Sequence, residues 1–205
     1  MKKVLYFATL LLCAAFTSCE KEEIGGTAVE SMAGQWYCTV DAVDENGNPI
    51  EEGEDYWGLG DPTLILTYNV AGNSSTQMWI NNQGIGNFAK DYNYPGYPDY
   101  DMKIKVSCDL GTLTFSSTEA ENFADPVIWS HKDEDGNIVI DNQVDPMPVS
   151  VEGKILKGAG RQNNGSPADS IIMYVTYKND PWYPDDGYAK YKISGIRYSG
   201  LVEND

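Results

Sequence analysis

The chain has 205 residues and a formal net charge of -17, with 14 Lys and Arg residues against 31 Asp and Glu residues. This charge argues against nucleic-acid binding, which requires Lys and Arg side chains to displace counterions from phosphates. It also argues against docking on an anionic membrane through a basic patch. The single histidine excludes a multi-histidine metal site, and no cofactor or metal is expected. Aromatic residues make up 12% of the chain, which favours a folded protein because disordered chains are poor in aromatics.

Residues 1–18 are predicted to be a signal peptide. Lys2 and Lys3 precede a mostly apolar run over residues 4–16. This run suits a secretory signal and is too short to span a bilayer, which takes about 20 residues. The small residues before Cys19 resemble a lipoprotein signal, in which cleavage leaves Cys19 as the acylated N-terminus that anchors the chain to a membrane. The alternative is an ordinary signal peptide in which this cysteine is incidental.

Residues 19–30 are predicted to form a flexible tether, because they are polar and contain glycine. Within them, the acidic run at residues 20–23 resembles the surface-export signal of lipoproteins in some Gram-negative anaerobes. This resemblance implies an exported outer-membrane lipoprotein exposed at the cell surface. The alternative is a tether whose charges only keep it solvated.

Residues 31–205 are predicted to form one all-β domain, because apolar and polar side chains alternate as in half-buried strands. The alternation is clearest over residues 101–108. The other strand-like segments are residues 36–42, 62–70, 76–80, 113–115, 126–131, 137–141, 149–157, 171–177 and 189–197. Residues 118–123 are compatible with one helical turn. About nine short strands with frequent turns are typical of an antiparallel sandwich or barrel.

The two ends of this domain carry a pattern found in barrels. Gly34 and Trp36 open the first long strand as a Gly-x-Trp motif, and Arg197 lies near the end of the last strand. This arrangement resembles the lipocalin and calycin barrels, in which the arginine packs across the tryptophan and closes the barrel floor. A guanidinium over an indole gains about 0.5–2 kcal/mol by cation–π attraction. The alternative is a core tryptophan and an unrelated surface arginine.

A narrower resemblance covers most of the chain after the signal. Residues 154–157, 168–171 and 192–200 follow one another as in the lipocalin-like "lipid-binding putative hydrolase" family of lipoproteins, and the last block is the most specific. Tyr198 and Ser199 stand where that family usually has a basic residue and a threonine. The resemblance implies a single antiparallel lipocalin-like barrel of about 8–9 strands, lipid binding, and hydrolysis.

A barrel of eight strands can hold one small ligand in its interior. The residues expected to line that interior are apolar and include adaptable methionines: Leu64, Leu66, Met102, Ile104, Val106, Phe115 and Met173. This lining suits an acyl chain or another small hydrophobic molecule. The alternative is a filled core without a cavity.

Catalytic and metal chemistry have little support in the sequence. His131 is the one candidate histidine base, and it lies on a predicted strand beside the turn at residues 135–136. A serine hydrolase also needs a nucleophile and an orienting acid, and no Gly-x-Ser-x-Gly motif occurs. No catalytic residue is therefore assigned. Residues 133–137 resemble a calcium loop, but the glycine falls early, so a hairpin turn is predicted.

Two further features leave alternatives open. Cys38 and Cys108 fall on the apolar sides of their strands and are predicted either to form a disulfide in an oxidising compartment or to be buried free thiols.

Two loops rich in tyrosine and proline offer candidates for stacking on sugars or anchoring a protein: Tyr94, Tyr97, Trp182 and Tyr183. Alternatively, these residues only rigidify the loops. The leading hypothesis is a lipid-anchored barrel that binds a small hydrophobic ligand, ahead of a surface glycan- or protein-binding module and of a hydrolase.

Overall fold

The computed structural model describes residues 26–50, 62–83, 89, 93–181 and 190–200. The strands in this part of the chain are β1 (Gly34–Val43), β2 (Thr63–Asn69), β3 (Gln77–Gln83), β4 (Lys103–Asp109), β5 (Thr114–Ala120), β6 (Val127–Lys132), β7 (Ile138–Val144), β8 (Val149–Arg161), β9 (Pro167–Tyr177) and β10 (Lys190–Arg197).

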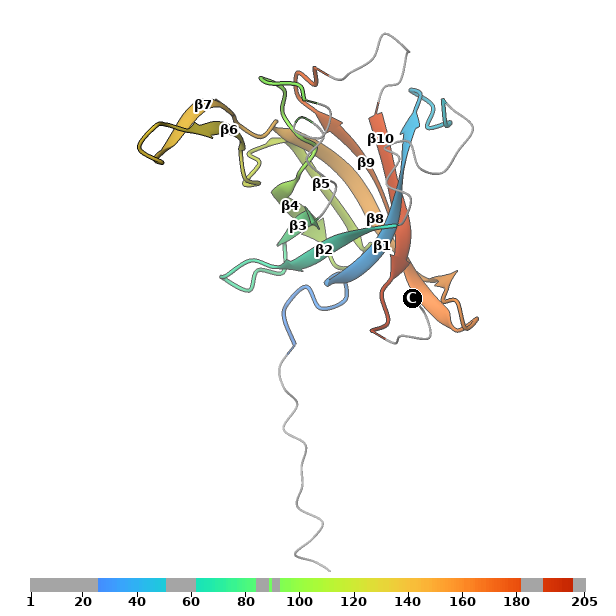
Figure 1. Cartoon of the computed structure of the whole chain (residues 1–205). Coiled ribbons are helices and arrows are strands. Elements are labelled where there is room, and N and C mark those ends of the chain that lie inside the picture. Colours follow the sequence, from blue (N-terminus) through green and yellow to red (C-terminus); the bar gives the residue numbers. More distant parts are fainter. Residues whose placement is uncertain (1–25, 51–61, 84–88, 90–92, 182–189, 201–205) are drawn as a thin grey trace, which may run out of the picture.

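Eight of these strands form one closed barrel in the order β1-β10-β9-β8-β5-β4-β3-β2, and neighbouring strands are antiparallel (Figure 1). The barrel closes because β1 pairs with both β2 and β10. The predicted all-β class and the predicted antiparallel barrel are confirmed. Strands β6 and β7 pair with each other in a separate two-stranded sheet.

The strand register places alternate apolar side chains on the inside of the barrel. Val40 is paired with Ile193, and Phe115 with Gly153, so that each pair shares the inner face. The inner side chains form one buried core, which includes Trp36, Cys38, Ile65, Met78, Ile80, Met102, Ile104, Val106, Val151, Met173, Val175 and Tyr191. Burial of an apolar side chain of this size stabilises the fold by about 1.5–3 kcal/mol, so this core is the main stabilising element.

The predicted orientation of β2 is wrong. Leu64 and Leu66 were expected to face inward, but they are half-buried on the outer face, whereas Ile65 and Thr67 are buried on the inner face. Hydrogen bonding by Thr67 explains this orientation. The Thr67 hydroxyl accepts a hydrogen bond from the Trp36 indole N–H at 2.9 Å and donates one to the Met32 carbonyl at 2.6 Å. Since Thr67 satisfies a buried indole, the inner face takes the threonine and not the leucines.

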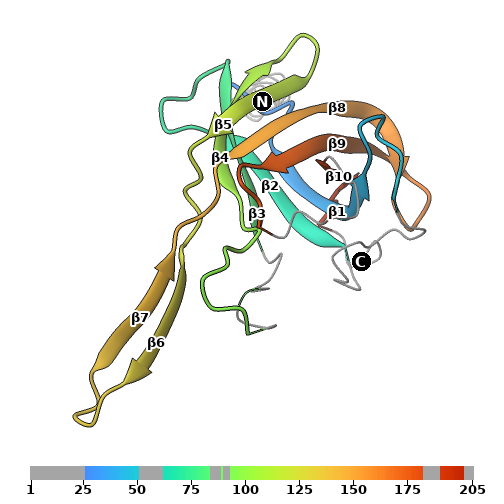
Figure 2. The same cartoon turned by 90° about the horizontal axis from the view of Figure 1, so that it is seen from above.

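Residues 118–123, which are compatible with one helical turn, do not form one. Strand β5 continues to Ala120, which pairs with Val149 of β8 after a register shift that begins at Ser117. Hydrogen bonds to the neighbouring strand pair the backbone N–H and C=O groups of this segment, so it does not need a helical turn to pair them. Because β5 and β8 are neighbours in the barrel, the segment between them is an insertion. Figure 2 shows its hairpin, β6 and β7, projecting away from the barrel.

Two hairpin turns share the pattern Asp-Glu-x-Gly-Asn, at residues 44–48 and 133–137. In the second, the Asp133 carboxylate accepts hydrogen bonds from the backbone N–H of Asp135 at 3.0 Å and of Asn137 at 2.8 Å. The hairpin turn predicted there is confirmed, because Lys132 and Ile138 pair across it. The Asp133 carboxylate bonds to the backbone of its own loop. Among the described residues, no helix combines the length and the hydropathy that a bilayer-spanning helix would need.

Candidate functional site

One end of the barrel, where β1 begins and β10 ends, is closed by Arg197 and Trp36. The two residues are paired in register, and the guanidinium carbon lies 4.4 Å from the indole ring centroid. The guanidinium also donates a hydrogen bond to the Ala33 carbonyl. Gly34 makes room for this contact, because a Cβ atom there would lie 2.6 Å from Arg197 Nη1. The structure therefore brings Gly34, Trp36 and Arg197 together, as the barrel resemblance implies.

An ion cluster surrounds this floor. Asp169 accepts a charged hydrogen bond from Lys157 Nζ at 2.9 Å and lies 3.3 Å from Arg197 Nε. Its other oxygen accepts the Gly158 N–H at 3.0 Å. Burial acts to raise the pKa of Asp169, but the hydrogen bonds from Lys157 and Gly158 and the nearby positive charges outweigh it, so the pKa lies below its ordinary value. Asp169 stays ionised and holds the arginine in place.

The interior of the barrel is occupied by its own side chains. The other inward candidates, Met102, Ile104, Val106, Phe115 and Met173, are all at most 2% exposed. The Phe115 ring lies directly against Gly153, because a Cβ atom at that glycine would be 2.5 Å from the ring. These five residues are thus brought together on the inner face as predicted, in a packed core.

Three buried tyrosines, Tyr100, Tyr177 and Tyr191, pack together toward the opposite end of the barrel. Their rings contact one another edge to face, with centroids 5.0–6.1 Å apart. The hydroxyls of Tyr100 and Tyr191 are 2.8 Å apart, so one donates to the other, and they lie 3.0 and 3.2 Å from oxygens of the Asp180 carboxylate. Tyr177 donates to the Tyr100 carbonyl at 2.7 Å. The three tyrosines thus form one buried, hydrogen-bonded group.

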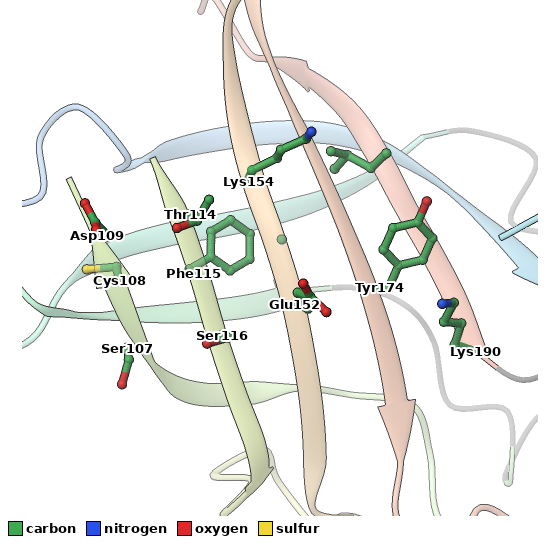
Figure 3. A pocket seen from close by; sticks show the side chains of 12 residues that line it. Ser107, Cys108, Asp109, Thr114, Phe115, Ser116, Glu152, Lys154, Tyr174 and Lys190 are labelled. Carbon is green, nitrogen blue, oxygen red and sulfur yellow. The ribbon is translucent and has the colours of Figure 1, made fainter. Parts of the chain in front are cut away.

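A groove of about 690 Å³ lies on the outer face of the barrel, across β4, β5, β8, β9 and the start of β10 (Figure 3). This volume is in the usual range for small-molecule sites, about 300–1,000 Å³. The side chains that line it from the outer face are Ser107, Asp109, Thr114, Ser116, Glu152, Lys154, Ile172, Tyr174 and Lys190. Cys108, Phe115 and Gly153, which face inward, complete the lining.

Strand register orders the groove into two rows. One row crosses the strands through Thr114, Lys154 and Ile172, and the next through Ser116, Glu152 and Tyr174. In Figure 3, Lys154 and Glu152 point in different directions from β8. Asp109 pairs with Thr114 and extends the first row, and Lys190 lies over Tyr174 in the second, so each row carries an acid and a lysine. The first row also has an apolar side chain, Ile172, and the second an aromatic ring, Tyr174.

The lysines of the groove are available to a ligand. Neither Lys154 nor Lys190 takes part in an ion pair with another described residue. Lys190 lies over the Tyr174 ring, with its Nζ 4.7 Å from the ring centroid. In a chain with a net charge of -17, two such amines on one face mark a place that can receive a negative group.

His131 does not belong to this groove. It lies on β6 of the projecting hairpin, where its Nδ1 is 2.7 Å from Asp141 Oδ1 and both side chains are at least half exposed. A histidine and an orienting carboxylate are two of the three groups that a serine hydrolase needs. Neither lies in the groove, and the pair is open to solvent. In the part of the chain that the structure describes, no cluster of three or more metal-ligating side chains occurs.

Of the aromatic-loop candidates, the two that the structure describes lie apart from the groove. Tyr94 and Tyr97 are exposed with ring centroids 5.6 Å apart, whereas Cys19, Trp182 and Tyr183 lie outside the described residues. Cys38 and Cys108 are buried free thiols in the structure, which is the second of the two alternatives considered for them.

Sequence reasoning did not find the groove, although a signal for it existed. Strand β9 is apolar on both faces, with Ile172 and Tyr174 alternating with the inward Ile171 and Met173. Apolar and aromatic residues on the outer face of an acidic chain indicate a binding surface. Lys154 on β8 could not be linked to these residues, because the sequence does not show that β8 pairs with β9.

The chain matches the lipid-binding putative hydrolase family over residues 21–202, and it therefore belongs to that family. The family description and the barrel fold support a lipid-binding role. A comparison with curated proteins finds no match.

Proposed function

We propose that this protein is exported, is anchored to a membrane through Cys19, and binds one amphipathic lipid with an anionic head group, without catalysis. The family supports the lipid ligand, and the N-terminal sequence pattern supports export and acylation. The observation that carries the choice of site is the outer groove, whose volume is about 690 Å³, beside an interior already packed with side chains.

Lys154 is the proposed partner of the head group. Its amine forms no ion pair with a described residue, and its neighbour in register, Thr114, offers a hydroxyl. A carboxylate or phosphate accepts charge-assisted hydrogen bonds from such donors, and these are stronger than neutral ones. The carboxylate of Asp109, which pairs with Thr114, is engaged by the backbone N–H groups of Gly111 and Thr112.

The apolar part of the lipid is proposed to lie along Ile172 and Tyr174. Both side chains are half-buried on the outer face and line the groove. Removing apolar surface from water stabilises a complex by about 25 cal/mol per Å². Lys190 covers the Tyr174 ring from the β10 side, so its methylene groups add apolar surface there.

The interior is the less favourable location. A ligand inside the barrel would have to displace side chains such as Met102, Phe115 and Met173, which are almost completely buried. Displacing one large core side chain costs about 2–5 kcal/mol.

A titration with a fatty acid tests the proposed site. Residues 20–205, which contain every described strand, are titrated with palmitate by calorimetry. Lys154→Met should weaken binding about tenfold, which corresponds to a loss of ~1.4 kcal/mol. The matched control is Lys105→Met, which removes an outward lysine from β4 that lies over Trp79 and not in the groove. Equal affinities for Lys154→Met and the unchanged protein would contradict the proposal.

The anchor is tested separately. In cells fed labelled palmitate, the full chain should become labelled and sediment with membranes, and Cys19→Ala should abolish both. A Cys19→Ala chain that still carries the label would contradict the proposed acylation site.

A second function is favoured by one observation, the adjacent exposed rings of Tyr94 and Tyr97, 5.6 Å apart. Paired exposed aromatic rings can stack on sugars or anchor a protein partner. If this pair binds a glycan, Tyr94→Ala should abolish retention on a glycan array while leaving palmitate binding unchanged.

A further inference from the structure

The projecting hairpin formed by β6 and β7 exposes apolar side chains that the barrel fold leaves uncovered. Ile138 is 71% exposed and Ile140 is 57% exposed, on the same face of β7, and Val139 between them is 38% exposed. Ile128 on β6 is also exposed. Isolated exposed apolar residues are ordinary, but three consecutive ones on one strand are not.

The hairpin contributes no strand to the barrel. Strands β5 and β8 pair directly with each other, and β6 and β7 form their own sheet. Figure 2 shows the hairpin extending away from the barrel wall. A two-stranded hairpin is marginally stable in water, and each free edge offers unpaired backbone N–H and C=O groups to another strand. The hairpin therefore lacks the third and fourth strands that would stabilise it.

We propose that the missing strands are supplied by a second copy of this chain, through antiparallel pairing of β7 with β7 about a two-fold axis. An axis at Val139 sets Ile138 against Ile140, Val139 against itself, and Asn137 against Asp141. Apolar side chains then face apolar side chains, and no carboxylate faces another between residues 137 and 141. An axis at Asp141 would instead oppose two carboxylates, which is destabilising. The register centred on Val139 is the one in which residues 138, 139 and 140 all face apolar side chains.

Charge argues against an anionic membrane as the partner of the hairpin. The tip of the hairpin carries Asp133, Glu134 and Asp135, which an anionic bilayer would repel. Two copies with a net charge of -17 each repel one another as well. That repulsion is screened over about 8 Å at physiological ionic strength, and the projecting hairpins keep the two barrels apart. Added salt should therefore strengthen the dimer.

The interface formed by two seven-residue strands is small, so the dimer should be weak and should depend on concentration. Sedimentation of residues 20–205 is measured over a concentration series, at low and high salt. The expected result is a reversible dimer that becomes tighter with salt. The double variant Ile138→Glu/Ile140→Glu should weaken it at least tenfold. The control Leu156→Glu, at an exposed apolar side chain of the barrel wall, should not.

Cross-linking tests the register. Under oxidising conditions Val139→Cys should form a disulfide between two chains, because residue 139 faces itself across the axis. Gln143→Cys on the same strand should not, because it faces residue 135. The native Cys38 and Cys108 are buried and do not interfere. A chain that remains monomeric up to about 1 mM, a dimer that survives the double substitution, or equal cross-linking at both positions would overturn the proposal.

Discussion

Arg197 lies over the ring of Trp36, with the guanidinium carbon 4.4 Å from the ring centroid, and each residue belongs to one of the two strands that close the barrel. The same guanidinium donates to the backbone carbonyl of Ala33 and lies beside the Asp169 carboxylate. One side chain thus ties the start of the first strand to the end of the last strand.

Replacing Arg197 should destabilise the fold. Arg197→Met removes the cation–π contact and the charged hydrogen bond to Ala33, and should lower the free energy of unfolding by about 2 kcal/mol. Arg197→Lys keeps the charge but not the planar guanidinium, so its loss should be intermediate. Urea unfolding measures both. Equal stabilities for the unchanged protein and Arg197→Met would mean that the floor contact contributes nothing.

Gly195 should not tolerate a side chain. A Cβ atom at this position would lie 1.8 Å from the Tyr37 carbonyl oxygen and 2.7 Å from the Cys38 Cα atom, both backbone atoms of the adjoining β1. Gly195→Ala should therefore cost about 3 kcal/mol or more, because β1 and β10 must move apart. Gly72→Ala is the control, since nothing lies within 4 Å of a Cβ atom there. Thermal unfolding of the two variants checks the difference.

Asp101 should make stability depend on pH. Burial, together with the charges of Asp99 and Asp125, raises the pKa of Asp101 to about 6, and its Oδ1 atom is buried without a hydrogen-bond partner among the described residues. The folded chain then binds this proton more tightly than the unfolded chain, so its contribution to stability falls as pH rises from about 4 to about 6.

The variant Asp101→Asn isolates this effect. It removes the buried charge, so it should be more stable than the unchanged protein at pH 7.5, and the advantage should shrink as pH falls through 6 and vanish near 4. Urea unfolding at each pH gives the difference. Asp135→Asn, an exposed change of the same charge in the hairpin turn, is the control. An advantage of Asp101→Asn that grows toward low pH would contradict the account.

The two inward cysteines should be unreactive until the chain unfolds. Burial raises the pKa of both thiols, most strongly that of Cys38, and the thiolate is the reactive form. In residues 20–205, a thiol reagent should label neither cysteine in buffer and both in urea without reductant. No labelling in urea would instead reveal a Cys38–Cys108 disulfide.

The sequence predicted the barrel because period-two alternation is a local property of each strand. The predicted strand segments match the ten strands found in the described part of the chain, including the two of the hairpin. The orientation of β2 was mistaken because Leu64 and Leu66 are more apolar than Thr67, while the decisive fact is the Thr67–Trp36 hydrogen bond between strands. The groove and the projection of the hairpin depend on which strands are neighbours, and the residues of one strand do not reveal that.

The most direct test of the proposed lipid site uses a fatty acid that carries a nitroxide on its acyl chain, added to isotope-labelled residues 20–205 while amide and methyl NMR signals are recorded. The account predicts broadening of the groove residues Thr114, Lys154, Ile172 and Tyr174, with the inner methyl groups of Ile104, Val106 and Met173 less affected. Strongest broadening at the inner methyl groups would place the ligand inside the barrel, and no broadening at all would contradict lipid binding at the groove.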